Sequence, residues 1–423
     1  MEKFIEYLYS KFLLCSSVSI DSRTVAEGAL FFGLNGPNFK GSKYAAAALE
    51  KGASFAVIDD PDEANDPKII YCEDTLKALQ SLAKFHRAFY KKPLIGLTGS
   101  NGKTTTKELM FRALSKKYIT HATKGNLNNH IGVPLTLLGI TPQTQMTIIE
   151  MGANHVGEIN ELCQMAQPTH GLITNIGSAH TATFGGFEGV IRGKSELFEY
   201  LRTSHGLPFI NTEDKVLANM AKRFEEKILY PSDAMKFVAA QPMMSYERAE
   251  VTHQTHLLGA YNYMNLAAVL AVGTYFKVEE ISLLDAVNNY QSDNMRSQLL
   301  LKGSNQILLD AYNANPDSMR VALNSLDAFE GDKVAILGDM NELEDSEAAH
   351  FQLLQEADQM GLRMIITVGP QMALIKDRFP EVKWFGTATE VTHFVREMSF
   401  EHTAVLIKAS RSIELELVVS SFN

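Results

Sequence analysis

The stretch Leu94–Met110, LIGLTGSNGKTTTKELM, decides how the middle of this chain folds. A short apolar run typical of a buried strand leads into a turn of small residues, and a lysine and three threonines follow where a helix would begin. Such a strand, turn and helix start form a phosphate cradle. Glycines let backbone amides close around the anion, and the helix N-terminus adds partial positive charge. The stretch therefore predicts a nucleotide-binding loop.

The loop departs from the common phosphate-loop pattern at one position. That pattern has a glycine five positions before the Gly-Lys pair, where this chain has Leu97, so the loop takes the tighter form TGSNGKTT. A chance Gly-Lys-Thr is the alternative, but the strand, turn and helix patterns all agree with a binding loop. The expected nucleotide contacts are Thr98, Gly99, Ser100, Asn101, Gly102, Lys103, Thr104 and Thr105, with Lys103 on the β- and γ-phosphates and Thr104 on Mg²⁺.

Length and composition bound the class of protein. A chain of 423 residues is too long for one ordinary core, so two or three domains are expected. A net charge of −10 argues against non-specific binding to nucleic acid or to a membrane surface. The three cysteines lie far apart without a CxxC pair, which suits a reducing compartment and excludes a disulfide framework. No segment reaches about 18 uninterrupted apolar residues, so we expect a cytoplasmic protein without membrane insertion.

Strand and helix patterns alternate along the whole chain. The simplest division is three α/β domains at residues 1–90, 91–300 and 301–423, the second with a doubly wound parallel sheet. Expected strands are GALFFGL and SFAVIDD in the first; LIGLT, MTIIEMG, HGLITNIG and PFINTED in the second; QILLDAY, KVAILGDM, MIITVGP and TAVLIKAS in the third. A long apolar helix is expected around GAYNYMNLAAVLAVGTYF.

Three chemistry-bearing residues follow predicted strands of the middle domain. Glu150 ends the strand MTIIE, where ligands collect in open α/β sheets, and its carboxylate would suit Mg²⁺ beside the phosphates. A solvated strand-end carboxylate is about as common. His180 follows the strand LITNIG, and Lys194 comes fourteen residues later. Taken singly, the histidine is more often structural and the lysine more often a surface charge.

These pieces occur together and in this order in the Mur ligases of peptidoglycan synthesis. The TGSNGKTT loop, the Glu150 strand, the His180–Lys194 spacing and the final KASRS all resemble that family, over nearly the whole chain. Three stretches resemble the branch that joins D-alanyl-D-alanine to a UDP-N-acetylmuramoyl-tripeptide. They are GNLNNHIGVPLTLL at 125–138, DAYNANPDSM at 310–319 and LGDMNEL at 337–343.

The resemblance implies an architecture and a reaction. The fold would comprise a small α/β UDP-binding domain, a central P-loop ATPase domain with a parallel sheet, and a C-terminal Rossmann-like α/β domain on the dipeptide side of the cleft. The enzyme would be an ADP-forming ligase. The tripeptide carboxylate would attack the γ-phosphate of ATP, and the dipeptide amine would then attack the acyl phosphate to give a UDP-N-acetylmuramoyl-pentapeptide. We expect a monomer with small-molecule substrates.

The resemblance also assigns roles to residues. Lys103, Lys194 and Arg296 would be catalytic, and two Mg²⁺ ions would be held by Thr104, Glu150, His180 and Lys194, the last as a carbamate. Asn265 would contact adenine, while Arg296 and Asp310 would contact ATP phosphate and ribose. The expected contacts to the other substrates are Ser22 and Arg23 for the uridine nucleotide; Asn128 and Asn129 for the muramoyl-peptide; and Asn313, Asn315, Pro316 and Asp317, which lie in the signature of the dipeptide-adding branch.

Some positions depart from the family pattern. Tyr261 stands where the family often has histidine, Glu344 and Ala409 where it has glycine, and Thr181 and Ala182 where Leu-Glu is common. None of these changes removes a phosphate or metal ligand, and Tyr261 is the one that falls beside the expected contact to the base.

Four other functions compete with this interpretation. The neighbouring ligase that adds the third residue typically carries a DNPR-like segment, and NANPDSM stands in its place here. Folylpolyglutamate synthase shares the phosphate loop but lacks the uridine-type first domain. A nucleotide-gated regulatory protein would favour loss of Glu150, His180 or Lys194, and all three are present. A simple phosphotransferase would make ADP without consuming an amine. The sequence leaves open the third residue of the tripeptide, the strictness for D-Ala-D-Ala and the base that deprotonates the amine.

Overall fold

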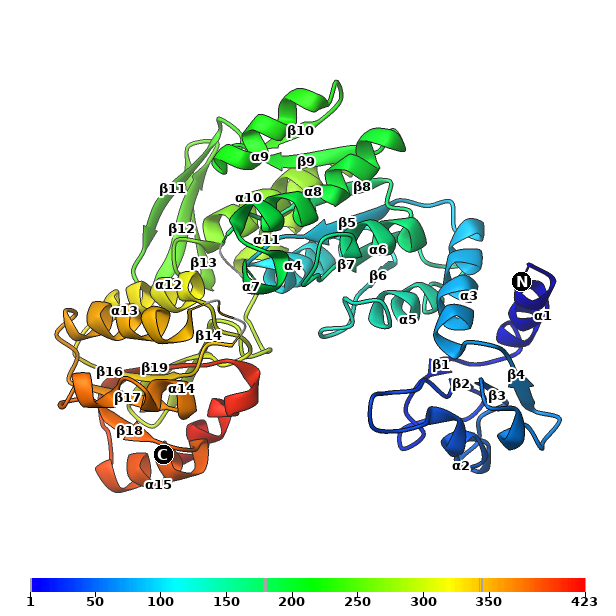
Figure 1. Cartoon of the computed structure of the whole chain (residues 1–423). Helices are drawn as coiled ribbons and strands as arrows, with labels where there is room; N and C mark the ends of the chain where they lie inside the picture. Colours follow the sequence, from blue (N-terminus) through cyan, green and yellow to red (C-terminus); the bar gives the residue numbers. More distant parts are fainter. Residues whose placement is uncertain (1, 178–180, 342, 344, 423) are drawn as a thin grey trace.

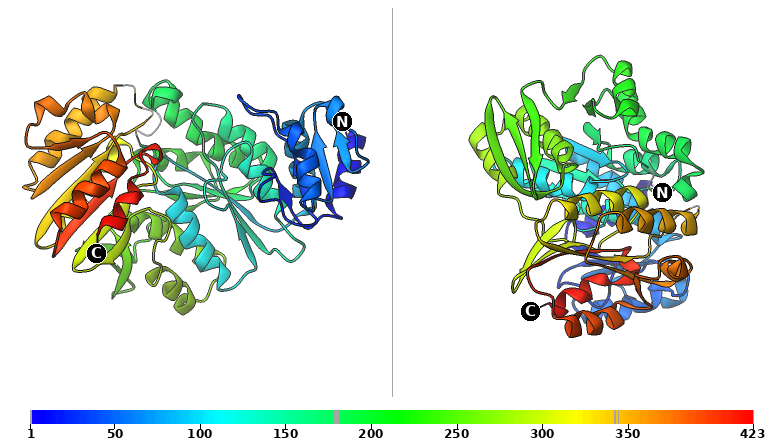
Figure 2. Two further views of the ribbon diagram at one scale, coloured as in Figure 1. Left: turned by 90° about the horizontal axis from the view of Figure 1, so that it is seen from below. Right: turned by 90° about the vertical axis from the view of Figure 1, so that its left-hand side faces the viewer.

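The computed structural model describes residues 2–177, 181–341, 343 and 345–422. Three α/β units follow one another along the chain, and the N-terminal and C-terminal units lie at opposite ends of the central one (Figures 1 and 2). The predicted architecture of three α/β units is confirmed. Within the described ranges, no helix has both the length and the apolar character that a membrane span needs.

The N-terminal unit is built on a four-stranded parallel sheet in the order β1-β2-β3-β4. Its elements are α1 (Glu2–Phe12), β1 (Val18–Ser19), β2 (Leu30–Phe32), α2 (Ala45–Glu50), β3 (Phe55–Ile58), β4 (Ile69–Tyr71) and α3 (Thr75–Phe89). The side chain of Asp74 caps α3 by accepting a hydrogen bond from the amide of Lys77. Helix α3 packs against α5 (Gly132–Leu138) and α6 (Glu158–Ala166) of the central unit, so the two units share one hydrophobic core.

The central unit contains a six-stranded parallel sheet in the order β10-β9-β8-β5-β7-β6. Its strands are β5 (Leu94–Thr98), β6 (Thr120–Ala122), β7 (Met146–Glu150), β8 (His170–Ile173), β9 (Leu207–Asn211) and β10 (Ile228–Tyr230). The chain proceeds from β5 to one side of the sheet and then crosses to β8 on the other side. The carboxyl end of β5 is therefore a switch point, where ligands of open α/β sheets bind.

Helices cover both faces of this sheet. They are α4 (Lys103–Ser115), α5 (Gly132–Leu138), α6 (Glu158–Ala166), α7 (Thr181–Phe184), α8 (Phe187–Thr203), α9 (Lys215–Met220), α10 (Asn262–Tyr275) and α11 (Glu280–Asn288). All five residues of β5 are buried, and they alternate between the two cores. Leu94 packs toward α5, α6 and α8, whereas Ile95 and Leu97 pack toward α4, α10 and α11. This double burial explains why LIGLT reads as a continuous apolar run.

A second, antiparallel sheet in the central unit does not follow the predicted parallel alternation. It consists of β11 (Met235–Ala240), β12 (Met243–Arg248) and β13 (Val251–Leu258), and β13 leads into α10. In β13 the polar residues Thr252 to His256 alternate between exposed and more buried positions. Only one face of this sheet packs on the core, so its strands lack the apolar runs of the parallel sheet.

The C-terminal unit is a six-stranded sheet in the order β14-β15-β19-β16-β17-β18, parallel except for the edge strand β14. Its elements are β14 (Gln298–Lys302), β15 (Asn305–Asp310), α12 (Pro316–Asp327), β16 (Asp332–Gly338), α13 (Ser346–Asp358), β17 (Met364–Val368), α14 (Pro370–Ala373), β18 (Lys383–Phe385), α15 (Ala388–Met398) and β19 (Thr403–Lys408). Alternate residues of β16 enter two separate cores, so this sheet too is covered on both faces.

Candidate functional site

The predicted phosphate loop joins β5 to α4. Gly99 and Gly102 both have positive φ, +143° and +78°. A Cβ on Gly99 would lie 2.0 Å from the hydroxyl of Thr174, and one on Gly102 would lie 2.5 Å from the amide oxygen of Asn265. Both positions therefore require glycine for space as well as for conformation.

Residues that follow β8 brace this loop. The amide of Asn101 donates to Oδ1 of Asn175 over 3.0 Å, and the hydroxyl of Thr174 donates to the carbonyl of Asn101 over 2.6 Å. The amide of Gly177 donates to the hydroxyl of Ser100 over 2.9 Å. Thr174 and Asn175 are not among the residues predicted for the site, although their position directly after a buried strand was an available signal.

Lys103, the first residue of α4, is turned toward its own loop. Its ammonium donates to the carbonyls of Gly99 and Ser100 over 2.6 and 3.0 Å. Burial lowers the pKa of Lys103 to about 8; the positive charge of Arg296 lowers it further and the carboxylate of Glu150 opposes the shift. Arg296 is thus close enough to Lys103 for their charges to interact, although the two residues belong to different parts of the chain.

Glu150 lies at the carboxyl end of β7 with 1% of its surface exposed. Its Oε1 accepts hydrogen bonds from the hydroxyl of Thr104 over 3.2 Å and from the side-chain Nδ2 of Asn128 over 2.8 Å. Its Oε2 is buried and has no hydrogen-bond partner in the described part of the chain. A buried carboxylate oxygen without a donor fits a bound cation, and the neighbouring Thr104 hydroxyl is a second hard oxygen ligand.

The other predicted metal ligands complete this picture only in part. Lys194 on α8 is 1% exposed, and its ammonium donates to the carbonyl of Ala153 over 3.1 Å. Burial lowers the pKa of Lys194 to about 7, and the charge of Lys103 adds to the effect. His180 lies outside the described residues. Among the residues that the structure describes, no three His, Cys, Asp or Glu side chains gather as a ready-made metal site.

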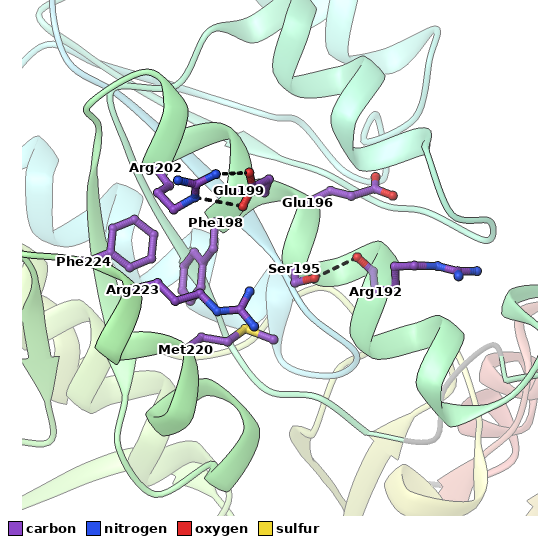
Figure 3. Close-up of a pocket in the computed structure, with 9 residues that line it drawn as sticks. All are labelled: Arg192, Ser195, Glu196, Phe198, Glu199, Arg202, Met220, Arg223 and Phe224. Carbon is purple, nitrogen blue, oxygen red and sulfur yellow. Dashed lines mark hydrogen bonds and ion pairs between the residues drawn. The ribbon is translucent and has the colours of Figure 1, made fainter.

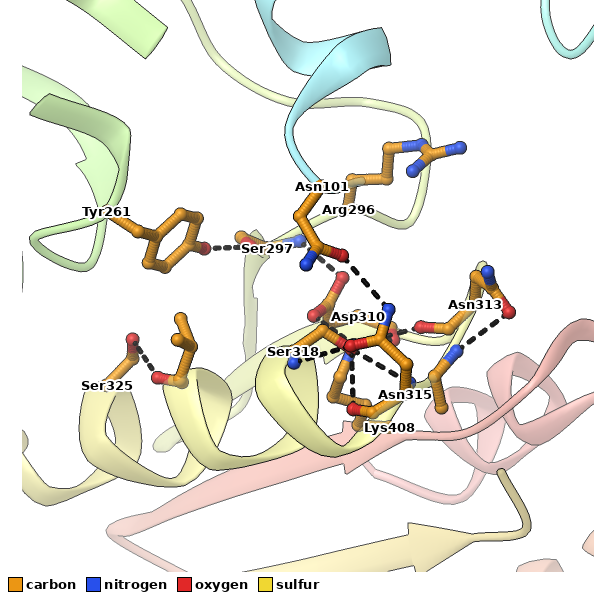
Figure 4. A network of polar contacts seen from close by, with 12 residues as sticks. Asn101, Tyr261, Arg296, Ser297, Asp310, Asn313, Asn315, Ser318, Ser325 and Lys408 are labelled. Carbon is orange, nitrogen blue, oxygen red and sulfur yellow. Dashed lines mark hydrogen bonds and ion pairs between the residues drawn. The ribbon is translucent and has the colours of Figure 1, made fainter. Parts of the chain in front are cut away.

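The C-terminal unit contributes side chains to the same place. The side-chain Nδ2 of Asn315 donates to Oδ1 of Asn101 in the phosphate loop over 3.0 Å (Figure 4). A side chain on Gly177 would lie 3.2 Å from Oδ2 of Asp317, so the first turn of α12 lies against the loop that braces the phosphate loop. Pro316 is the first residue of that helix, and Asn315 caps it by accepting from the amide of Ser318 over 2.9 Å.

Other predicted residues have local partners of their own. Asn265 is buried; its Oδ1 accepts from the hydroxyl of Thr106 and its Nδ2 donates to Asn262. Oδ1 of Asn129 accepts from the amides of Ile131 and Gly132 at the start of α5, and Asn313 accepts from the amide of Ala314. These bonds occupy some of the polar atoms that the sequence assigned to ligands.

The predicted uridine contacts lie in the N-terminal unit, away from the phosphate loop. Arg23 is exposed and forms a two-pronged ion pair with Asp21, and this pairing lowers the pKa of Asp21 to about 2. Ser22 lies between them in the sequence. The structure therefore brings together Lys103, Glu150, Arg296 and Asn315, but not Ser22 and Arg23.

A separate hollow of about 210 Å³ runs along α8 and the segment after α9 (Figure 3). Its lining residues are Arg192, Ser195, Glu196, Phe198, Glu199, Arg202, Met220, Arg223 and Phe224. Neither Lys194 nor any residue of the phosphate loop lines it. The candidate site is thus defined by converging polar groups and not by this hollow.

These features are typical of a nucleotide-dependent enzyme. The phosphate loop lies at a switch point of the sheet, a buried glutamate oxygen beside it lacks a donor, and a second α/β unit contributes side chains. Family models match three segments of the chain. The Mur ligase middle domain matches residues 97–273, the Mur ligase glutamate ligase domain matches residues 295–411, and the Mur ligase family catalytic domain matches residues 15–87. The chain belongs to the Mur ligase family.

Individual relatives agree over nearly the full length. The UDP-N-acetylmuramoyl-tripeptide–D-alanyl-D-alanine ligase of Bacillus subtilis is 33% identical, covering 95% of this chain and 92% of that protein. The enzyme of the same name from Escherichia coli is 31% identical, with the same coverage of both chains. A crystal structure of MurF from Acinetobacter baumannii superposes with a TM-score of 0.85 at 28% identity, covering 96% of this chain and 92% of that one.

Proposed function

We propose that this chain is an ADP-forming amide ligase that adds D-alanyl-D-alanine to UDP-N-acetylmuramoyl-tripeptide. The product would be the UDP-N-acetylmuramoyl-pentapeptide used for peptidoglycan, made by a monomer in the cytoplasm. One observation carries the proposal beyond nucleotide binding. Asn315 from the C-terminal unit donates a hydrogen bond to Asn101 in the phosphate loop, and the charges of Arg296 and of the partly unpartnered Glu150 carboxylate both act on Lys103. A phosphoryl group held between two units suits transfer to an acceptor bound in the same cleft.

The phosphate loop would hold ATP, with contacts from Thr98 to Thr105. Lys103 leaves the carbonyls of Gly99 and Ser100 and moves to the β- and γ-phosphates, and Arg296 supplies a second positive charge from the C-terminal side. Thr104 and Glu150 would hold Mg²⁺, and His180 and Lys194 would hold a second ion. Bound Mg²⁺ supplies neutralisation of the charge on the transferring phosphoryl group.

Lys194 would act as a carbamate. A buried ammonium beside a cation is repelled by it, and the lowered pKa leaves a large fraction of the amine neutral near pH 7. The neutral amine nitrogen bonds to the carbon of CO₂ and loses one proton, which replaces a positive group with a negative one. The resulting carboxylate-like oxygens are hard ligands for Mg²⁺.

The three substrates would meet three units, divided at residues 1–90, 91–300 and 301–423. Ser22 and Arg23 bind the uridine nucleotide, Asn128 and Asn129 face the muramoyl-peptide, and Asn265 and Asp310 contact adenosine. Asn313, Asn315, Pro316 and Asp317 face the dipeptide side.

The carboxylate of the tripeptide is a poor electrophile, so its oxygen takes the γ-phosphoryl group. The dipeptide amine then attacks the acyl carbon and phosphate leaves. Closure of the units excludes water from this acyl phosphate.

The test is phosphate release from ATP and Mg²⁺ with UDP-N-acetylmuramoyl-tripeptide, with and without D-Ala-D-Ala, together with product mass. Release that depends on the dipeptide, with a pentapeptide product, supports the ligase. Release that ignores the dipeptide would instead indicate a phosphotransferase. Tripeptides ending in diaminopimelate and in lysine should be compared in the same assay, because no described contact selects between them.

A further inference from the structure

A continuous chain of polar contacts runs from the central unit into the C-terminal sheet (Figure 4). The phenol of Tyr261, which precedes α10, shares a short hydrogen bond with the hydroxyl of Ser297. The amide of Ser297 donates to Oδ1 of Asp310 over 3.2 Å. The ammonium of Lys408 donates to Oδ2 of Asp310 over 2.6 Å and to the carbonyl of Asn313 over 2.9 Å. Tyr261 is thereby joined to the loop that precedes α12.

The far end of this chain is a rigid anchor. Asp310 and Lys408 end the neighbouring parallel strands β15 and β19 and are partners in their register. Lys408 is 1% exposed, so its charge depends on Asp310 and on the carbonyl of Asn313. Asp310 is half-buried, and separating the pair would leave the buried ammonium of Lys408 without its counter-charge; this cost holds both side chains in place. Asp310 therefore presents a fixed acceptor to the amide of Ser297.

The near end of the chain is a strained segment. Met295 and Ser297, on either side of Arg296, have φ of +58° and +48°, which L side chains rarely adopt. Such a conformation persists only where the surroundings hold it. The contacts that hold Ser297 come from Tyr261 and Asp310.

Arg296 depends on this backbone for its direction. Its guanidinium carbon lies 3.8 Å from the centre of the Tyr312 ring, and its Nε is buried without a hydrogen-bond partner in the described residues. The hydroxyl of Ser292 donates to the backbone carbonyl of Arg296, so this hydrogen bond does not involve the guanidinium. Fixing the segment therefore fixes where the guanidinium enters the site.

We propose that Tyr261 is a positioning residue for phosphoryl transfer, because its hydroxyl holds the strained segment that carries Arg296, the residue expected to contact the phosphates of ATP. This inference rests on the proposed function. Tyr261 would act through Ser297 and Arg296. Burial, and the negative charge of Asp310, raise the pKa of Tyr261, so the phenol stays neutral and keeps its proton at the pH of any ordinary assay. Gly259 makes room for the ring, since a Cβ there would lie 2.3 Å from it.

The first test is Tyr261→Phe, which removes only the hydroxyl. We expect kcat to fall about five- to tenfold, as for the loss of one hydrogen bond, while the KM for ATP and the melting temperature change little. Tyr263→Phe is the matched control. Tyr263 lies two residues later, in the first turn of α10, and its hydroxyl donates to the carbonyl of Met235 over 2.9 Å, outside the chain of contacts. An unchanged kcat in Tyr261→Phe, or an equal loss in both variants, would overturn the inference.

A double-mutant cycle with Ser297→Ala tests the contact itself. Both variants remove the same hydrogen bond, so the double variant should lose no more kcat than either single one. Arg296→Ala should also keep its ATP binding, and its kcat should fall further than that of Tyr261→Phe. Losses of Tyr261→Phe and Ser297→Ala that multiply would contradict a shared role.

A measurement without substrates separates this inference from the proposed function. Hydrogen exchange of the Ser297 amide should speed up several-fold in Tyr261→Phe and stay unchanged in Tyr263→Phe, because the first variant frees the strained segment. Unchanged exchange in Tyr261→Phe would overturn the positioning role even if the wild-type protein makes pentapeptide. If the wild type makes none, faster exchange would still support the role of Tyr261 in holding Arg296.

Discussion

The environment of Glu150 fits a bound cation, because one of its carboxylate oxygens is buried without a hydrogen-bond donor in the described part of the chain. The other oxygen has two donors. In Glu150→Gln the shape is kept and the charge is lost. We expect turnover to fall about 100-fold or more, since the metal loses an anionic ligand. The melting temperature without Mg²⁺ should stay the same or rise, because a buried, half-partnered charge is removed.

The control for Glu150→Gln is Glu161→Gln on α6. Glu161 is exposed, so the same chemical change should leave turnover and the Mg²⁺ requirement as they are. Steady-state phosphate release over a Mg²⁺ titration, with thermal unfolding in EDTA, measures both properties. A Glu150→Gln variant with full turnover at ordinary Mg²⁺ would remove Glu150 from the metal site.

Lys194 gives a prediction with a defined pH window. Its pKa is about 7 in the folded chain against an ordinary 10.5, so between these values the unfolded chain binds more protons. Stability of the carbamate-free protein therefore rises with pH across this window, and the full penalty applies below pH 7. We expect Lys194→Met to be more stable than the wild type at pH 7 in CO₂-free buffer, by roughly a few kcal/mol. The difference should shrink toward pH 10.

Denaturant unfolding at pH 7 and pH 9.5, with and without bicarbonate, checks this prediction. Bicarbonate should stabilise the wild type and not Lys194→Met, and Lys194→Met should lose turnover. Lys215→Met, at an exposed position on α9, should change neither stability nor its bicarbonate dependence. Equal effects of bicarbonate on the wild type and Lys194→Met would argue against the carbamate.

Asn315, at the start of α12, has two roles that different substitutions can separate. Asn315 caps the helix through its oxygen and reaches Asn101 through its nitrogen. Asn315→Ala should lower the free energy of unfolding by about 1 kcal/mol, the usual contribution of a cap. Asn315→Asp keeps the cap but places a carboxylate against the phosphate loop. It should retain stability and raise the KM for ATP about tenfold, because the carboxylate repels the phosphates.

Asp345, the cap of α13, offers a matched comparison. Its side chain accepts from the amide of Ala348 over 3.0 Å. Asp345→Ala should destabilise the protein about as much as Asn315→Ala and leave the KM for ATP unchanged. If Asn315→Asp binds ATP as the wild type does, the contact between α12 and the phosphate loop has no part in nucleotide binding.

The elements that sequence predicted best are those with two buried faces. LIGLT and KVAILG are continuous apolar runs because each strand packs between two helical layers, so their pattern survives in the sequence. The sheet formed by β11, β12 and β13 has one exposed face, so its strands mix polar and apolar residues and were not recognised. The loop glycines could be predicted from the sequence because their backbone conformations require glycine. Thr174 and Asn175 could not, because no local pattern shows that the fold places them beside the loop.

Contacts between segments that are far apart in the chain could not be predicted from the sequence. Tyr261 reads as a departure from a family pattern, and only its contact with Ser297 reveals a structural task. Asn315 and Asn101 are 214 residues apart, yet they share a hydrogen bond. Such pairs depend on how one unit sits on another, and no local pattern encodes that arrangement.

The separation of the units leads to a prediction about substrates. Arg23 belongs to the N-terminal unit, which lies at one end of the molecule, beyond the central sheet that carries the phosphate loop (Figure 1 and the left view of Figure 2). Its side chain is 84% exposed, so the ion pair with Asp21 contributes little to stability. Arg23→Ala should therefore raise the KM for UDP-N-acetylmuramoyl-tripeptide about tenfold, through a lost phosphate contact, and leave the KM for ATP, kcat and the melting temperature unchanged.

Arg202→Ala is the corresponding control, since Arg202 is also exposed and paired in two-pronged fashion, with Glu199 on α8. It should change none of these constants. Initial rates with each substrate varied in turn distinguish the outcomes. A rise in the KM for ATP in Arg23→Ala would mean that the N-terminal unit reaches the nucleotide site during turnover. The uridine and ATP sites would then have to be treated as one, because a charge removed at one end of the molecule would be felt at the phosphates.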